Sequence, residues 1–84
     1  MPLHFELVTP ERLVRAQDVY MVVIPGSEGD MGILGGHAPV MTTIRDGDVK
    51  IYASDKGEPE IIAIKGGFAE VTERGLTILA ESAA

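Results

Sequence analysis

The sequence has no cysteine, few basic residues and no long hydrophobic run. Without cysteine it can form no disulfide, no thiol nucleophile and no cysteine zinc site, which fits a reducing compartment. The longest apolar run, Val19–Ile24, is far too short to span a bilayer. The first residues contain neither a basic region nor a long apolar stretch, so no signal peptide is expected.

The charge balance argues against two classes of partner. Seven lysine and arginine residues are scattered among thirteen acidic residues, and the formal net charge is −6. Nucleic acids and anionic membrane surfaces both attract clustered basic residues, so neither nucleic acid nor direct membrane adhesion is expected. A protein partner that carries a basic patch suits this chain better.

The hydrophobic pattern predicts one small β domain over residues 1–84. Hydrophobic residues make up 45% of the chain, a normal value for a globular protein, and their dominant period is two. Short strands at near-regular spacing, with turn signals between them, predict an all-β flattened sandwich or barrel of about eight to ten short, mostly antiparallel strands. The clearest expected strands are Leu3–Leu7, Val19–Ile24, Val40–Ile44, Val49–Ala53, Ile61–Ile64, Phe68–Thr72 and Leu76–Ala80.

Local signals refine this pattern. The continuous β-branched run Val19–Ile24 predicts a strand that is covered on both faces. Asp46-Gly47 predicts a two-residue hairpin turn between the strands on either side of it. Gly66-Gly67 predicts a β-bulge or a sharp bend. Residues 9–17 favour a short edge strand or a turn over a helix that begins at Pro10, because a helix of about two turns is marginal without packing.

The segment Ile24–Pro39 is rich in glycine, with five of the ten glycines of the chain. Glycine loses more conformational entropy on folding than other residues, so this cluster indicates special backbone angles or the close approach of another surface. The glycines do not open a helix and no Lys-Ser or Lys-Thr pair follows them, which argues against a phosphate or dinucleotide loop. Glu28, Asp30 and His37 in this segment therefore favour an interface with a partner.

No pattern of residues predicts an active site, a cofactor or a metal centre. The serines have no histidine and acid partners at a motif spacing, and Asp46-Gly47-Asp48 lacks the further oxygen ligands of a calcium loop. Two alternatives stay open. Asp55-Lys56-Gly57 resembles the turn of lipoyl-carrier domains, with Lys56 as the attachment point. His37 together with Asp30 could bind a ligand or a metal.

Several motifs, kept in order and spacing over essentially the whole chain, resemble one known family. They are Pro-Gly-x-x-Gly-x-x-Gly-Ile-Leu-x-Gly-His-Ala-Pro at 25–39, Gly-x-Val at 47–49, Gly-Gly-Phe-x-Glu-Val at 66–71 and Leu-Thr-Ile-Leu-Ala at 76–80. Together these motifs are similar to the N-terminal domain of the epsilon subunit of bacterial F-type ATP synthases. Gly35 departs from the pattern, because the family commonly has proline there.

The resemblance implies a non-catalytic rotor subunit at the foot of the central stalk. Such a subunit joins the gamma subunit to the ring of c subunits and couples proton flow to ATP synthesis, without a cofactor. It would lie peripherally on the cytoplasmic side of the bacterial plasma membrane, and one sheet face should carry an exposed apolar patch. The residues implied at the partner surfaces are Glu28, Asp30, Met31, His37, Val40 and Met41.

The family commonly continues into a C-terminal pair of helices that can inhibit ATP hydrolysis and, in some members, bind ATP. The present sequence holds no such hairpin up to Ala84. Self-inhibition and ATP sensing are therefore not carried over to it.

Overall fold

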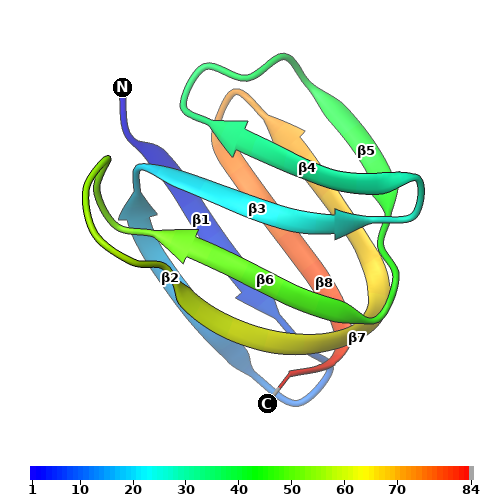
Figure 1. The fold of residues 1–84 in the computed structure, drawn as a ribbon. Coiled ribbons are helices and arrows are strands. Elements are labelled where there is room, and N and C mark those ends of the chain that lie inside the picture. Colours follow the sequence, from blue (N-terminus) through cyan, green and yellow to red (C-terminus); the bar gives the residue numbers. More distant parts are fainter. Residues whose placement is uncertain (84) are drawn as a thin grey trace.

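The computed structural model describes residues 1–83, and the regular structure in that range consists of strands (Figure 1). Eight strands were expected as the lower bound, and the described residues form eight. In chain order they are β1 (Leu3–Val8), β2 (Leu13–Val19), β3 (Met21–Gly26), β4 (Gly29–Leu34), β5 (Val40–Thr43), β6 (Gly47–Tyr52), β7 (Glu60–Thr72) and β8 (Gly75–Ala83).

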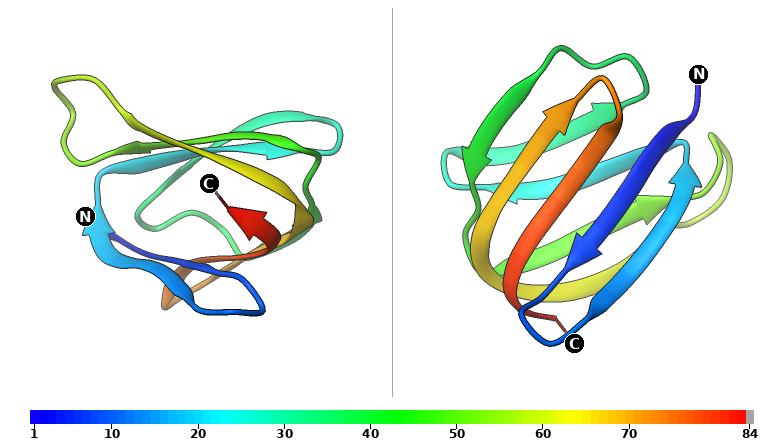
Figure 2. Two further views of the ribbon diagram at one scale, coloured as in Figure 1. Left: turned by 90° about the horizontal axis from the view of Figure 1, so that it is seen from below. Right: turned by 180° about the vertical axis from the view of Figure 1, so that it is seen from behind.

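The strands form two layers that face each other, which confirms the predicted sandwich (Figure 2). The first layer has the order β2-β1-β8-β7, with β5 on the far side of β7. The second layer has the order β7-β6-β3-β4. Neighbouring strands pair antiparallel except β1 and β8, which pair parallel. The long strand β7 takes part in both layers.

The bend in β7 lies at the predicted Gly66-Gly67 position. Both glycines have positive φ angles, 51° and 108°, which residues with a side chain rarely adopt. The register between β7 and β8 is the same before and after the bend, so the feature is a bend and not a bulge. Before it β7 pairs with β6, and after it β7 pairs with β5. Two adjacent glycines thus let one strand pass from the second layer, beside β6, to the first layer, beside β5.

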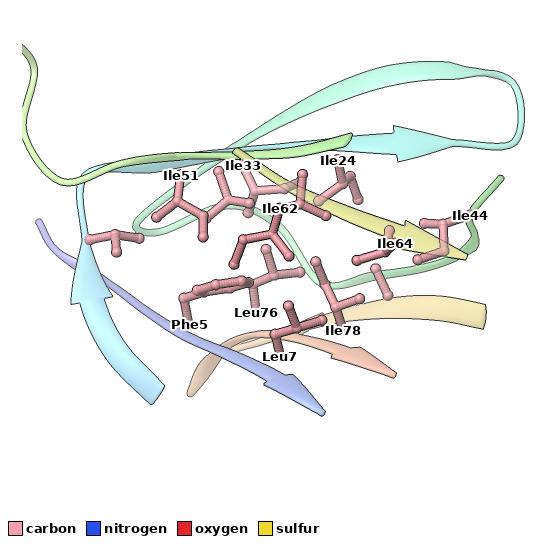
Figure 3. Close-up of a cluster of buried hydrophobic side chains, with 14 of the residues drawn as sticks. Phe5, Leu7, Ile24, Ile33, Ile44, Ile51, Ile62, Ile64, Leu76 and Ile78 are labelled. Carbon is pink, nitrogen blue, oxygen red and sulfur yellow. The ribbon is translucent and has the colours of Figure 1, made fainter. Parts of the chain in front are cut away.

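The core lies between the layers and follows the period of two in the sequence. Alternate side chains of β1, β6, β7 and β8 point inward, while their neighbours point to solvent. Each fully buried aliphatic side chain contributes roughly 1.5–3 kcal/mol to folding. Figure 3 shows the centre of this core, which includes Phe5, Leu7, Ile24, Ile33, Ile44, Ile51, Ile62, Ile64, Leu76 and Ile78.

The structure confirms one expectation on the first half of the chain and corrects another. Residues 13–19 form the edge strand β2, so the preference for an edge strand over a helix is confirmed. The run Val19–Ile24 is not one strand covered on both faces. It divides at the exposed Tyr20, where the chain leaves β1 as partner and joins β4 and β6. In β3, Val22 and Ile24 are buried, whereas Met21 and Val23 are half-buried.

The predicted hairpin at Asp46-Gly47 is wrong. Strand β5 pairs with β7, while β6 pairs with β3 and β7, so the segment between them is a corner from one layer to the other. Gly47 has no positive φ angle. An added Cβ there would lie 3.2 Å from the Cβ of Pro25, so close packing explains this glycine. The bend in β7 offers β5 an edge that sequence spacing does not reveal.

Candidate partner-binding surfaces

The first half of the glycine-rich segment is a β-hairpin and not an open loop. Strands β3 and β4 pair from Met21 with Leu34 to Gly26 with Gly29, and Ser27-Glu28 form the turn. A Cβ on Gly26 would lie 2.6 Å from the carbonyl oxygen of Gly29, so the close approach of the two strands requires glycine at this position. Glu28 and Asp30 are exposed at this end of the molecule.

A third segment holds this hairpin end in place. The Ser27 N–H donates to the Thr43 carbonyl oxygen at 3.0 Å, and the Arg45 N–H donates to the Pro25 carbonyl oxygen at 2.9 Å. The Arg45 guanidinium donates from Nη2 to Asp30 Oδ1 at 2.6 Å and from Nη1 to the Gly26 carbonyl oxygen. Sequence analysis identified Asp30 but missed Arg45, since the pair is 15 residues apart along the chain.

His37 lies beyond the opposite end of β4, in the loop from 35 to 39. Its N–H donates to the Leu34 carbonyl oxygen at 3.1 Å, and its ring Nδ1 donates to the carbonyl oxygen of Ala38 at 2.7 Å. The N-terminal residues pack beside this loop, and a Cβ on Gly35 would collide with the carbonyl oxygens of Met1 and Pro2. Gly35, the departure noted in the sequence, therefore gives the N-terminus room.

The six predicted partner residues thus fall into separate places. Glu28 and Asp30 lie at the hairpin end and His37 lies at the other end of β4, so the structure does not bring Asp30 and His37 together as a ligand site. Met31 packs half-buried against the core, and so does Val40 on β5. Met41 is the most exposed of the three apolar candidates, with 62% of its surface accessible.

The outer face of the first layer carries an apolar row. Strand register places Leu13 opposite Val8, Val8 opposite Leu79, and Leu79 opposite Phe68, so the four side chains cross β2, β1, β8 and β7 on one face. Leu13, Leu79 and Phe68 are exposed and Val8 is half-buried. At the β5 end, the row meets a shallow hollow of about 350 Å³ lined by Met41, Thr42, Thr43 and Phe68.

The outer face of the second layer is also partly apolar, but its row is shorter. Leu34, Met21 and Tyr52 lie opposite one another on β4, β3 and β6. In the neighbouring row, Lys50 lies between Val23 and Ile61. The apolar patch expected on one sheet face is therefore largest on the first layer. The strands that build it are distant in sequence, which is why the sequence did not identify its members.

A charged cluster borders the apolar row of the first layer. His4 Nδ1 lies 3.0 Å from Asp18 Oδ1, and His4 Nε2 lies 3.1 Å from Glu6 Oε2. The hydrogen bond to Asp18, followed by that to Glu6, raises the pKa of His4 above its usual value. All three side chains are solvent-accessible, so this cluster is part of the surface and not of the core.

Within residues 1–83, no three His, Cys, Asp or Glu side chains gather in a way that could hold a metal ion. The described residues include no helix long and apolar enough to cross a membrane. Lys56 is exposed in the connection between β6 and β7, and its backbone N–H donates to the Ser54 hydroxyl at 3.3 Å.

Comparison with protein families bears on the resemblance and on the lipoyl-carrier alternative. The family model for the β-sandwich domain of the ATP synthase delta/epsilon chain matches residues 2–84. The chain belongs to this family. The match runs through Lys56 and both ends of β4, so the lipoyl-carrier alternative is not supported.

Curated relatives agree with this assignment. The chain is 59% identical over 80 residues to the ATP synthase epsilon chain of Parvibaculum lavamentivorans, covering 94% of this chain and 59% of that protein. It is 52% identical over 81 residues to the ATP synthase epsilon chain of Caulobacter vibrioides, covering 96% of this chain and 92% of that protein. The chain thus spans about three fifths of the first relative and nearly all of the second.

Solved structures share the fold. A chain of the Euglena gracilis mitochondrial ATP synthase, solved as an OSCP/F1/c-ring assembly, superposes with a TM-score of 0.88 at 25% identity, covering 99% of this chain and 52% of that chain. A chain of the Tetrahymena thermophila mitochondrial ATP synthase central stalk and c-ring superposes with a TM-score of 0.83 at 15% identity, covering all of this chain and 66% of that one. The second likeness shows the fold alone.

Proposed function

We propose that this chain is a central-stalk subunit of a proton-translocating F-type ATP synthase. In this role it joins the gamma subunit to the ring of c subunits, couples proton flow to ATP synthesis, and has no active site of its own. Its place is peripheral, on the cytoplasmic side of a bacterial plasma membrane, and it contacts the membrane only through the complex. The family membership and the likeness to ATP synthase epsilon chains support the assignment.

The observation that carries the proposal is the apolar row of Leu13, Val8, Leu79 and Phe68. A small acidic domain gains nothing in isolation from leaving such side chains in water, whereas a protein partner buries them. The row crosses four neighbouring strands, so the surface is stiff, as a rotor that transmits torque requires. We assign the gamma subunit to this face, together with Met41 at its β5 end.

The acidic end of the β3–β4 hairpin is then left for the ring. Glu28 and Asp30 are exposed there, and carboxylates form strong charge-assisted hydrogen bonds with arginine or lysine. His37, at the other end of β4, lies near the gamma side of the assembly in this arrangement. Met31 and Val40 act mainly through the core packing that supports these surfaces.

The test uses an ATPase head from the source organism that retains the gamma subunit and lacks this chain. We expect the chain to co-elute with that head at about one copy per head. Leu79→Asp is expected to abolish co-elution, because it places a charge in the centre of the apolar row. Ile61→Asp is the matched control, since Ile61 is also an exposed strand residue but lies on the second layer.

Each outcome of this test has a clear meaning. Loss of binding in Leu79→Asp with normal binding in Ile61→Asp supports the assigned face. The reverse pattern would place the gamma subunit on the second layer. A wild-type chain that elutes alone at low and moderate salt would refute the central-stalk assignment.

A further inference from the structure

The strongest unassigned feature is the network around Arg45 at the end of the β3–β4 hairpin. Arg45 lies in the connection between β5 and β6, outside both strands of the hairpin. Its guanidinium reaches the last residue of β3 through the Gly26 carbonyl oxygen and the second residue of β4 through Asp30 Oδ1. One side chain from a third segment therefore links both strands at the point where the hairpin turns.

The backbone around this side chain is linked as well. The Ser27 N–H donates to the Thr43 carbonyl oxygen, and the Thr43 hydroxyl donates to the Ser27 hydroxyl at 2.9 Å. Gly26 and Ile44 form an isolated antiparallel bridge. These bonds bring the hairpin end against the corner that leads from one layer to the other, so Arg45 completes a connection that the backbone begins.

The network gives the two acidic residues of the hairpin end different surroundings. Asp30 is one of the acids in the four ion pairs formed within residues 1–83, and its partner is Arg45. Glu28 belongs to none of those pairs and is exposed in the turn. Asp30 is bound within the chain, and Glu28 is available to another molecule.

We propose that Arg45 is a positioning residue: it binds Asp30 and the Gly26 carbonyl, fixes the shape of the hairpin end, and leaves Glu28 as the carboxylate that meets a cationic side chain of the ring. The assignment rests on the proposed function in one respect, namely that this end faces the ring. The bond network itself is a property of the isolated chain and is tested without a partner.

The first experiment measures hydrogen exchange of the Ser27 amide in the isolated chain by NMR. Arg45→Gln is expected to speed this exchange about 3- to 10-fold, since an exposed ion pair with an added hydrogen bond contributes modestly to local stability. Arg74→Gln is the matched control, because Arg74 is exposed in the β7–β8 turn and belongs to none of the four ion pairs. The charge exchange Asp30→Arg with Arg45→Asp is expected to recover only part of the lost protection, because it restores the ion pair but a carboxylate at 45 cannot donate to the Gly26 carbonyl oxygen.

The second experiment measures ATP-driven proton pumping in membrane vesicles in which variants replace the native subunit. Glu28→Gln is expected to lower pumping per ATP hydrolysed about 2- to 5-fold, and Asp30→Asn to lower it less. The Glu28→Gln defect should shrink at high salt, where the wild-type contact is itself screened. Glu58→Gln, which removes an exposed carboxylate from the β6–β7 connection, should leave pumping unchanged.

The outcomes separate this inference from the proposed function. Equal Ser27 exchange in Arg45→Gln and Arg74→Gln would overturn the positioning role and leave the rotor assignment intact. A pumping defect in Asp30→Asn as large as that in Glu28→Gln would overturn the division of roles between the two acids. Normal pumping in Glu28→Gln and Glu28→Lys would overturn Glu28 as the partner contact, and with it the ring contact of the proposed function, whatever the exchange rates show.

Discussion

Replacing Gly67 by alanine tests the bend that divides β7 between the two layers. Gly67 has a φ angle of 108°, and it lies opposite Ala80 in the β7–β8 pairing. An alanine Cβ would overlap the carbonyl oxygen of Leu79 and would lie 2.9 Å from its carbonyl carbon and 3.0 Å from the Cα of Ala80. These are backbone atoms of the neighbouring strand, so no side-chain rotation relieves the overlap, and β8 must move.

The expected cost combines two terms. A residue with a side chain at positive φ costs about 1–2 kcal/mol, and forcing extra volume into a packed site costs about 1–3 kcal/mol or more. We therefore expect Gly67→Ala to lower the free energy of unfolding by about 2–5 kcal/mol. Folding free energies of about 0.05–0.15 kcal/mol per residue give this chain roughly 4–13 kcal/mol in total, so the loss is a large fraction. The midpoint of thermal unfolding should fall by at least about 8 °C.

Gly57→Ala is the matched control for this measurement. Gly57 has a φ angle of 99°, similar to that of Gly67, but a Cβ there has no atom within 4 Å. Its substitution should cost only about 1 kcal/mol, because alanine also restricts the unfolded chain. Thermal and urea unfolding of the two variants give two losses of stability, and their difference measures the cost of the overlap with β8. Equal losses in the two variants would refute the overlap with β8 as the reason for glycine at 67.

Three further predictions concern the surface cluster, the core and the N-terminus. The raised pKa of His4 means that its bond to Asp18 stabilises the fold fully below the unfolded pKa of about 6.5, and that this contribution disappears as pH rises through the folded pKa. The stability difference between wild type and His4→Gln, measured by urea unfolding, should therefore be larger at pH 5.5 than at pH 9. The side chain of Ile78 has no exposed surface, so Ile78→Val should lower the free energy of unfolding by about 0.5–1.5 kcal/mol. Ile61 is exposed, so Ile61→Val should lower it by less than about 0.5 kcal/mol in the same assay. Gly35→Ala should displace the N-terminal residues and shift NMR signals at residues 1–2 and 34–37 while leaving the core signals in place.

Each of these has a clear contrary result. A His4→Gln effect that grows with rising pH would reverse the sign derived from the carboxylate bonds. Equal costs for the two isoleucine changes would contradict the assignment of inward and outward faces. If the NMR signals of residues 1–2 were unchanged in Gly35→Ala, the N-terminus would not pack against Gly35.

The sequence by itself determined the fold class, most of the strands and the family. Alternation of apolar and polar residues is a local property, so Leu3–Leu7 and Leu76–Ala80 could be located from their own side chains. The bend at Gly66-Gly67 was equally local, because two adjacent glycines mark a backbone that other residues avoid. Family motifs recorded the spacing of these features along the whole chain.

Only the tertiary structure decided which strands are neighbours. The hairpin signal at Asp46-Gly47 was local, whereas the structure pairs β5 with β7 from Val40 to Thr43, and that pairing decides where β5 lies. The apolar row from Leu13 to Phe68 and the bond between Arg45 and Asp30 join residues far apart in the chain. Such surfaces depend on register and on the order of strands in the sheet, which are set by the packing of all eight strands together, and a single sequence does not encode them in any local pattern.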